Sequence, residues 1–319
     1  MHAKGDKVTT TRRRDRAEGA LLGVAVGDAL GAGYEFGSTR LGPDGPAMIG
    51  GGLGDFAPGE WTDDTTMTWC IADVVARGLD LRTDAGLTAV ARNFRAWFET
   101  GPPDIGIQTR RVLAAAGPDP TGAELVEAAR DLAASGARTA GNGSLMRTAP
   151  VALAYLDDPE ACADAARAVS GLTHADPLAA QACVIWTAAI RAAVVEERFD
   201  VRVGLDLLDT DARARWSALL DRAESGDPDE FAPNGFVVTA LQAAWSAIHH
   251  TREGRDGEAH VRAALARVIA VGDDTDTTAA IAGALLGARW GAAAVPADWR
   301  EGCHGYPGIT GDELVALAP

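Results

Sequence analysis

Apolar residues in this chain recur at intervals of three or four, the spacing that places them on one face of an α-helix. In Thr65–Leu79 the residues on this spacing include Met67, Ile71 and Val75. Further helices are predicted for Glu18–Val26, Leu87–Phe98, Gly235–His250, Glu258–Ala270 and Thr277–Trp290. No segment of several residues alternates cleanly between apolar and polar residues, as a half-buried strand would. We therefore predict an all-α fold, built as a single compact orthogonal helical domain.

The clearest helix start lies in the middle of the chain. Asp176 is a favoured N-cap residue, and Pro177 suits the first helical position. The stretch that follows is apolar nearly all round, so this helix is expected at the centre of the fold. In the last predicted helix, Gly283 and Gly287 are four residues apart, which favours close approach of another helix.

No segment has the composition of a linker between domains, and no internal repeat is visible, so residues 16–319 are predicted to form one domain. Residues 1–15 are polar and basic and contain no apolar signal-peptide core, so a disordered basic tail is expected. The longest apolar stretches, Leu178–Ile190 and Thr277–Gly287, are shorter than the roughly 18 residues that span a bilayer. We expect a soluble monomer or weak oligomer without a membrane partner.

The formal net charge of the chain is −16. Such an acidic protein is not expected to bind nucleic acid, because the phosphate backbone is itself negative. No two cysteines form a C-x-x-C pair, and this pattern favours buried thiols in a reducing compartment over a disulfide framework. The cysteines are Cys70, Cys162, Cys183 and Cys303. A cytoplasmic location is therefore expected.

Two short acidic clusters lie far apart in the chain, each just before a predicted helix. The first contains Thr62, Asp63 and Asp64, and the second contains Asp273, Asp274, Asp276 and Thr277. Like charges in one turn repel unless a positive group lies among them. A hard divalent cation is the natural candidate, since it takes oxygen ligands. Helix capping explains the first cluster well by itself, but it accounts for only one acid of the second.

Three other segments hold candidate site residues, each with a structural alternative. Glu35 follows the glycine-rich run Gly27–Gly33, and it is either a site carboxylate or an ordinary surface acid. The turn Gly141–Arg147 suits contact with an anion through backbone N–H groups, or it is a simple Asn-Gly turn. Within it, Arg147 contacts either a phosphate or one of the many acids. His174 precedes the central helix and is either a binding residue or a capping or core histidine.

Taken in order, these segments resemble the ADP-ribosylglycohydrolases, the family of dinitrogenase reductase-activating glycohydrolase and the ADP-ribosyl-acceptor hydrolases. The matching segments are Gly19–Gly31, Thr62–Thr65, Gly141–Arg147, Thr173-His174, Asp274–Thr277, Gly283–Ala288 and Pro296–Trp299. The resemblance runs from about Arg16 to Trp299. Asp273 departs from it, because the family usually has a glycine there, and the segment Ala137–Ala140 also differs from the best-studied members.

The resemblance implies a metal-centred cleft in an all-α fold, holding two Mg²⁺ ions, with Mn²⁺ as the alternative. The implied metal ligands are Thr62, Asp63, Asp64, Asp274, Asp276 and Thr277. Glu35 matches a family glutamate linked to catalysis or to gating of the site, and Asp63 is the second candidate catalytic carboxylate. The residues implied to bind ADP-ribose are Gly141, Asn142, Gly143, Ser144, Met146 and His174.

The expected activity is hydrolysis of the N- or O-glycosyl bond between ADP-ribose and an acceptor, which is a protein or a small molecule. Bound cations would reverse the local field of this acidic chain, and a carboxylate could accept a proton as an oxocarbenium-like state forms. One alternative is a relative that binds ADP-ribose or serves a structural role without turnover, as crystallin-like members do. Another is a haloacid-dehalogenase-like phosphatase, because Asp274, Asp276 and Thr278 match its nucleophile loop. That motif requires a Rossmann-like sheet after it, and the chain ends at residue 319.

Overall fold

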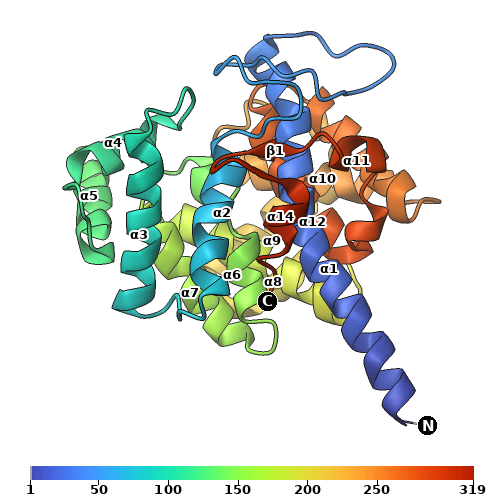
Figure 1. Ribbon diagram of the computed structural model, residues 1–319, viewed down its shortest axis with the longest axis horizontal. Coiled ribbons are helices and arrows are strands. Elements are labelled where there is room, and N and C mark those ends of the chain that lie inside the picture. The colour runs from blue at the N-terminus through green and yellow to red at the C-terminus, as the bar shows by residue number, and fades with distance from the viewer. Residues whose placement is uncertain (1) are drawn as a thin grey trace.

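The computed structural model describes residues 2–319, with side chains from residue 10 onward. The α-helices are α1 (His2–Gly31), α2 (Asp63–Ala76), α3 (Asp84–Glu99), α4 (Ile107–Ala115), α5 (Gly122–Ala134), α6 (Ala149–Ala154), α7 (Pro159–Gly171), α8 (Pro177–Glu196), α9 (Thr210–Ser225), α10 (Val237–Thr251), α11 (Gly257–Ala270), α12 (Thr275–Trp290), α13 (Ala297–Arg300) and α14 (Gly311–Val315). Short 3₁₀ helices cover Ala32–Gly37, Asn142–Ser144, Val201–Leu207, Pro228–Phe231 and Ala292–Ala294. The prediction of a mostly helical single domain is confirmed (Figure 1).

Within the described residues the strands are β1 (His304–Gly305) and β2 (Ile309–Thr310), which pair antiparallel. These strands have two residues each and follow α13 near the end of the chain. The parallel sheet that a haloacid-dehalogenase-like phosphatase requires is therefore missing from the part of the chain that the structure describes. The phosphatase interpretation of Asp274 and Asp276 is wrong for this reason.

Helices α1 and α12 pack along each other through glycines. A Cβ atom placed on Gly23 would lie 2.0 Å from the carbonyl oxygen of Gly283, and one on Gly287 would lie 1.8 Å from that of Gly19. Only hydrogen fits between the two backbones at these positions. The close approach predicted from the spacing of Gly283 and Gly287 is confirmed. It aligns the end of α1 with the start of α12, where the acidic cluster lies.

Helix α8 occupies the interior, as its apolar circumference predicts. The side chain of Asp176 caps it by accepting a hydrogen bond from the Leu178 amide at 2.9 Å. The helix is longer than the apolar stretch counted in the sequence. Its 20 residues and mean hydropathy of 1.7 would suffice to cross a membrane, and 72% of that window is buried inside the fold. Trp186 at its centre is fully buried and donates to the carbonyl of Ile281 on α12 at 3.1 Å.

The first and last segments of the chain both pack on the central helices. Arg13 pairs with Asp157, and the Asp15 carboxylate accepts a hydrogen bond from the amide of Ala293 at 3.2 Å. Arg13 and Asp15 lie inside the segment predicted as a tail, and their side chains contact the rest of the fold. Residue 1 lies outside the described residues. At the other end, the His304 carbonyl of β1 accepts a hydrogen bond from the Trp61 amide at 2.9 Å, just before α2.

Candidate metal centre and active site

The two acidic clusters meet where the first turns of α2 and α12 face the end of α1. The hydroxyl of Thr62 lies 3.1 Å from Oδ2 of Asp64 and 3.4 Å from Oδ2 of Asp276, which are on different helices. The hydroxyl of Thr277 lies 3.4 Å from the same oxygen of Asp64. Oxygen atoms of Asp28, Asp64 and Asp276 all lie within 4.8 Å of one another, and all three residues are buried.

Asp28 supports this cluster from α1. Its Oδ1 accepts hydrogen bonds from the amide and hydroxyl of Thr62, and its Oδ2 accepts from the amide and hydroxyl of Thr65. Burial raises its pKa to about 6, and the hydrogen bonds from Thr65 and Thr62 oppose this rise. Asp28 therefore braces the first turn of α2, which carries Asp63 and Asp64.

The donor set fits a hard cation. Oδ1 of Asp64 is buried without a hydrogen-bond partner among the described residues. Burial raises the pKa of Asp64 well above its usual range, and the charges of Asp28 and Asp63 add to the effect. For Asp276 the pKa is raised in the same way by burial and then by Glu35. An unpartnered acceptor and several mutually repelling oxygens are stabilised when a cation binds them. The buried aspartates could therefore hold a metal ion.

Glu35 lies on the other side of Asp276, in a second group of carboxylates. Oxygens of Glu35, Asp104 and Asp276 lie within 4.8 Å of one another. The pKa of Glu35 is raised to about 9 by burial and then by the negative charge of Asp104 and of other acids in the cluster. Asp104 comes from the loop between α3 and α4, and it was not among the site residues predicted from the sequence. A lone acid in a loop carries no local signal, since only the fold brings it near Glu35.

Asp63 and Asp274 lie at the edge of the cluster rather than in these two groups. Oδ2 of Asp63 accepts a hydrogen bond from the amide of Gly106 at 3.1 Å. Its pKa is raised to about 7, first by burial and then by Asp104. Oδ2 of Asp274 accepts from the side-chain amide of Asn142 at 2.8 Å. Each of these carboxylates therefore accepts a hydrogen bond from a neutral donor on one of its oxygens.

The backbone conformation at residue 273 suits both the glycine expected from the resemblance and the aspartate that this chain has there. Asp273 has φ of 57°, in the left-handed region that glycine adopts readily and aspartate tolerates better than most residues. Its carbonyl accepts a hydrogen bond from the Phe36 amide at 2.7 Å. Asp273 thus joins the segment after Glu35 to the start of α12 through its backbone.

Asn234 joins the turn Gly141–Arg147 to the second acidic cluster. Its Oδ1 accepts from the Asp274 amide at 2.9 Å, and its carbonyl accepts from the side chain of Asn142 at 3.2 Å. Asn234 is fully buried. Asn234 was not among the site residues predicted from the sequence, because its partners lie far away in the chain.

His174 packs against the glycines of the predicted binding turn. A Cβ atom on Gly143 would lie 3.3 Å from Cε1 of His174, and one on Gly141 would lie 3.5 Å from Nε2. Ser144 is directed into the core instead, where its hydroxyl accepts from Ser170 at 3.0 Å. Met146 Sδ lies 3.9 Å from the hydroxyl of Thr277. The structure thus brings the glycines and His174 together, and the Ser144 side chain is used for packing.

Arg147 orients the Thr173 hydroxyl beside the His174 ring. It donates to the Thr173 hydroxyl at 2.7 Å, and that hydroxyl lies 2.8 Å from Nδ1 of His174. Since arginine only donates, the Thr173 oxygen accepts from Arg147, and its own proton is free to be donated to Nδ1. Burial, with the charge of Arg147, lowers the pKa of His174 well below its usual range. This arrangement favours the neutral tautomer with its proton on Nε2, on the side of the glycines.

The sequence suggested that Arg147 binds a phosphate or pairs with an acid. Among the described residues it pairs with no acid, and its burial keeps it away from the surface where a phosphate would bind. It is completely buried, with its guanidinium 4.8 Å from the centre of the Phe94 ring and a further hydrogen bond to the Val169 carbonyl at 3.3 Å. Its pKa is lowered to about 10 by burial. Arg147 is thus a buried structural cation behind the predicted binding turn.

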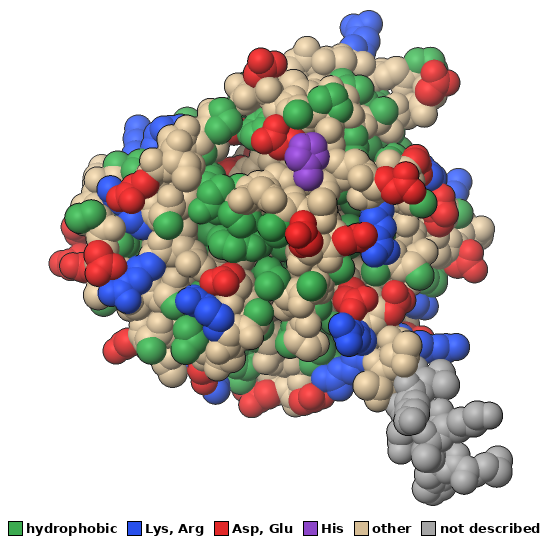
Figure 2. All heavy atoms as spheres, viewed as in Figure 1, with side chains coloured by type: hydrophobic (Ala, Val, Ile, Leu, Met, Phe, Trp, Pro, Cys, Tyr) green, Lys and Arg blue, Asp and Glu red, His purple; other side chains and the backbone are tan. Residues whose placement is uncertain are grey.

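A cavity of about 360 Å³ opens beside the cluster. Asp63 and Asp104 line it together with Glu60, and none of its lining residues is an arginine or a lysine. Its other walls come from the C-terminal β-hairpin and from aromatic and proline side chains, which include Trp97, Pro102, Tyr306 and Pro307. The cavity combines negative charge with apolar walls. Acidic side chains are also spread widely over the face of the molecule shown in Figure 2.

Comparison with known proteins gives one consistent result. A model of the ADP-ribosylglycohydrolase family matches residues 9–319. The ADP-ribosylarginine hydrolase Tri1 of Pseudomonas putida (strain GB-1) is 31% identical over 317 residues, with 94% of this chain and 77% of that protein covered. The ADP-ribosyl-dinitrogen reductase glycohydrolase of Rhodospirillum rubrum is 28% identical, with 89% of each chain covered. Human ADP-ribosylhydrolase ARH3 is 25% identical, with 92% of this chain and 91% of that protein covered.

A solved structure supports the same relationship. The structure titled "ADP-ribosylglycohydrolase-related protein complex" has a TM-score of 0.67 and 30% sequence identity to this chain, and 97% of each chain is covered. The sequence motifs, the helical fold and the buried carboxylates at the start of α2 and α12 agree with these matches. This chain belongs to the ADP-ribosylglycohydrolase family.

Proposed function

We propose that this protein is a magnesium-dependent hydrolase that cleaves the glycosidic bond between ADP-ribose and a modified acceptor. The observation that carries the proposal is the convergence of Asp28, Asp64 and Asp276 in a buried site where one carboxylate oxygen, Asp64 Oδ1, has no partner among the described residues. Relatives of this chain are hydrolases of ADP-ribosyl compounds by name. Burying several carboxylates without a bound cation lowers the stability of the fold, so a functional role is the simplest reason for the cluster.

The proposed metal site contains two Mg²⁺ ions, with Mn²⁺ as the alternative. Its ligands are taken from Thr62, Asp63, Asp64, Asp274, Asp276 and Thr277. Asp28 supports them from behind, since each of its oxygens already accepts two hydrogen bonds. Divalent ions at such a site supply positive charge that attracts oxygen atoms of a substrate and stabilises negative charge.

Glu35 and Asp63 are the proposed catalytic carboxylates. Only 6% of Glu35 is exposed, and no hydrogen bond from a described residue lowers the pKa of its carboxyl group. Asp63 has one oxygen fixed by Gly106 and lines the cavity beside the cluster. In cleavage at the anomeric carbon, one carboxyl group protonates the leaving group and another takes a proton from the attacking water. Glu35 and Asp63 are available for these two proton transfers.

Neutral donors are proposed to hold the diphosphate of ADP-ribose. Gly141 and Gly143 lie next to the His174 ring, and their backbone amides, with a ring N–H of His174, are the proposed donors. Such donors bind an anion without adding a charge that would compete with the metal ions. The Asn142 side chain connects this turn to Asp274, so the phosphate region and the metal region are held in one relative position.

The proposed acceptor is an arginine side chain. The cavity beside Asp63 and Asp104 is lined by carboxylates, is flanked by Trp97 and Tyr306, and has no arginine or lysine in its lining. A guanidinium group is complementary to such walls, because it pairs with carboxylates and stacks on aromatic rings. Two relatives named Tri1 are ADP-ribosylarginine hydrolases by name. The four free, buried cysteines are consistent with the proposed cytoplasmic location.

The test compares two peptides that carry ADP-ribose on arginine or on serine, incubated with purified protein and Mg²⁺. Free ADP-ribose is measured by mass spectrometry. We expect faster release from the arginine peptide. Glu35→Gln should reduce the rate by about 100-fold or more, as loss of an acid–base group does. Glu301→Gln, which alters an exposed carboxylate, is the control and should leave the rate unchanged. Tight binding of ADP-ribose without release from either peptide would instead identify a binding relative.

A further inference from the structure

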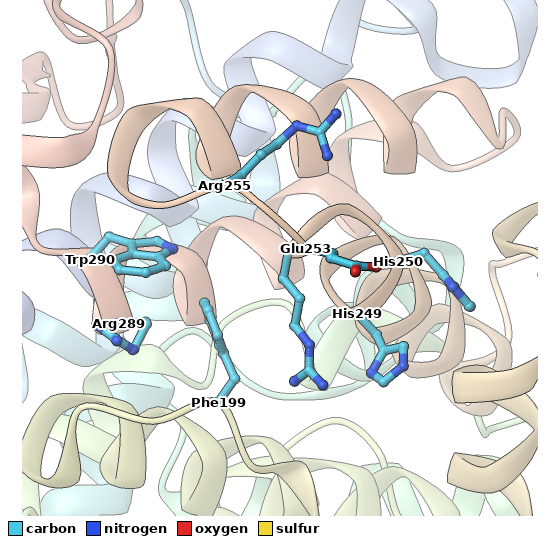
Figure 3. Close-up of a pocket in the computed structure, with 8 residues that line it drawn as sticks. Phe199, His249, His250, Glu253, Arg255, Arg289 and Trp290 are labelled. Carbon is cyan, nitrogen blue, oxygen red and sulfur yellow. The ribbon is translucent and has the colours of Figure 1, made fainter.

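A second cavity, of about 560 Å³, lies at the C-terminal end of α12 (Figure 3). Its walls come from the segment after α8, the end of α10, the loop between α10 and α11, and the end of α12. The residues that line it are Phe199, His249, His250, Arg252, Glu253, Arg255, Arg289 and Trp290. None of them belongs to the acidic cluster. Because α12 has 16 residues and rises about 1.5 Å per residue, its two ends are about 22 Å apart.

The second cavity concentrates positive charge in a strongly acidic protein. Arg252, Arg255 and Arg289 line it, and the structure contains no ion pair for any of them among the described residues. Elsewhere arginines pair readily: Arg202 bridges Asp221 and Glu224 at 2.8 and 2.7 Å. The three cavity arginines thus remain without carboxylate partners although the chain has a net charge of −16.

The nearby acids do not neutralise this charge. Glu197, whose charge acts on Arg289, is already paired with Arg16 at 3.0 Å. Glu253 is the one acid that lines the cavity, and it is exposed. Burial lowers the pKa of His260, the hydrogen bond with Ile248 opposes this shift, and the charges of Arg255, Arg252 and Arg289 each lower the pKa further. Their positive fields therefore overlap at the same wall of the cavity.

The floor of the cavity is fixed by hydrogen bonds and ring contacts. Trp290 donates its indole N–H to Nδ1 of His260 at 3.1 Å, and Nε2 of His260 donates to the Ile248 carbonyl at 3.0 Å. The Arg289 guanidinium lies 4.1 Å from the centre of the Trp290 ring system. Phe199 meets Trp290 edge to face at 5.9 Å. Arg289 is thus held on a rigid aromatic surface before any ligand arrives, which lowers the entropy lost on binding.

An unused polar atom lies in the same wall. Nδ1 of His249 is buried and has no hydrogen-bond partner among the described residues. Burial, followed by the charge of Arg252, lowers the pKa of His249, so its ring is neutral at neutral pH. In Figure 3 the labelled rings lie around the cavity and come from the segment after α8 (Phe199), from α10 (His249) and from α12 (Trp290). The cavity therefore offers apolar ring surface and polar groups in addition to the arginines.

We propose that this cavity is a second ligand site, which binds a phosphorylated anion that carries an aromatic ring, such as a nucleoside diphosphate. Guanidinium groups bind phosphate through paired hydrogen bonds. The aromatic walls suit a ring, and the volume lies within the range of about 300 to 1,000 Å³ that small-molecule sites occupy. A bound anion would also relieve the repulsion among the three arginines.

The proposal is tested by calorimetry on the full-length protein in the presence of a chelator, with ADP, pyrophosphate and adenosine as probes. We expect ADP to bind, pyrophosphate to bind more weakly and adenosine to bind least, because charge and ring both contribute. Raising the salt concentration should weaken ADP binding. Equal affinity for ADP and adenosine would overturn the proposal, since it would show that the arginines do not hold the phosphates.

Variants assign the binding to this cavity rather than to the acidic cluster. Arg252→Gln with Arg289→Gln should weaken ADP binding by tenfold or more. The matched control, Arg130→Gln with Arg215→Gln, removes two exposed arginines elsewhere and should not change it. Arg252→Gln alone alters an exposed residue and should weaken ADP binding partially. This single variant keeps the test valid if the double variant misfolds. An unchanged ADP affinity in the cavity variants, or no ADP binding by the wild-type protein, would overturn the proposal.

Discussion

The side-chain amide of Asn142 donates a hydrogen bond of 2.8 Å to Oδ2 of Asp274, which is 132 residues further along the chain. This contact joins the glycine turn before α6 to the second acidic cluster. Asn234 strengthens the connection, since it contacts both Asn142 and the Asp274 amide. The proposed phosphate-binding turn and the proposed metal site are therefore parts of one hydrogen-bonded unit.

Asn142→Ala should reduce kcat/KM for release of ADP-ribose by about 10- to 100-fold, the usual effect of losing a group that orients a metal ligand. The apparent affinity for Mg²⁺ should fall as well, because the Asp274 carboxylate loses its donor. The unfolding temperature should change little, since Asn234 still holds the Asp274 amide. Unaltered Mg²⁺ dependence in this variant would show that the contact does not position Asp274. Rates at a series of Mg²⁺ concentrations provide the measurement.

The protonation of His174 gives a pH prediction with a defined sign. Its pKa is lowered in the folded state by burial and Arg147, whereas the unfolded value is 6.5. Below about pH 6.5 the unfolded chain therefore binds up to one more proton at this residue than the folded chain. The free energy of unfolding decreases as the pH is lowered, by up to about 1.4 kcal/mol per pH unit. His174→Gln should remove this contribution. Urea unfolding of both proteins between pH 5 and 8 measures the difference, and identical slopes would contradict the account.

The tautomer of His174 can be observed directly. In the wild-type protein, ¹⁵N NMR should show a neutral ring with its proton on Nε2. Thr173→Val removes the hydroxyl between Arg147 and Nδ1, so the ring should lose its fixed tautomer. Thr173→Ser retains the hydroxyl and serves as the control. A proton on Nδ1 in the wild-type protein would refute the assignment.

Asp28 is expected to act on stability. Asp28→Asn replaces an acceptor of four hydrogen bonds by a side chain whose amide would face the donors of Thr62 or Thr65. Leaving buried donors unpaired costs about 1 to 3 kcal/mol each. Chemical denaturation in chelator should therefore show a loss of at least about 2 kcal/mol. A variant as stable as the wild-type protein would show that Asp28 does not brace α2.

The contact of α1 with α12 predicts a second stability effect. Gly283→Ala places a methyl group 2.0 Å from the Gly23 carbonyl oxygen, so the helices must separate. We expect a loss of about 1 to 3 kcal/mol or more, as for other overpacked cores. Gly171→Ala is the matched control in α7, where a Cβ meets nothing within 4 Å, and it should be neutral or slightly stabilising. Equal unfolding temperatures for the two variants would contradict this packing.

The sequence predicted the helical class and the two acidic clusters because these features are local. Spacing of apolar residues marks a helix, and the hydroxyls and acids at Thr62 and Thr277 mark a helix start. The close contact at Gly283 was also predictable from glycine spacing. The short strands β1 and β2 were missed, since two residues each give no alternation.

Other site residues could not be predicted because their roles arise from tertiary contacts. Asp104 lies in a loop and joins Glu35 only when α3 packs against α2. Asn234 resembles any turn asparagine until its contacts with Asn142 and Asp274 are known. The sequence assigned Arg147 to a phosphate or an acid, whereas burial places it behind His174. In each of these cases the local sequence is compatible with an ordinary loop.

The central claim is that the two acidic clusters form one metal site on which hydrolysis depends. The most direct test measures ADP-ribose released from an arginine-modified peptide in excess chelator, after addition of Mg²⁺, and with an Asp274→Ala, Asp276→Ala double variant. An Asp131→Ala, Asp211→Ala variant, which removes two exposed acids, is the control. We predict no release in chelator, recovery with Mg²⁺ in the wild-type and control proteins, and none in the cluster variant. Full release in excess chelator, or by the cluster variant, would contradict the account.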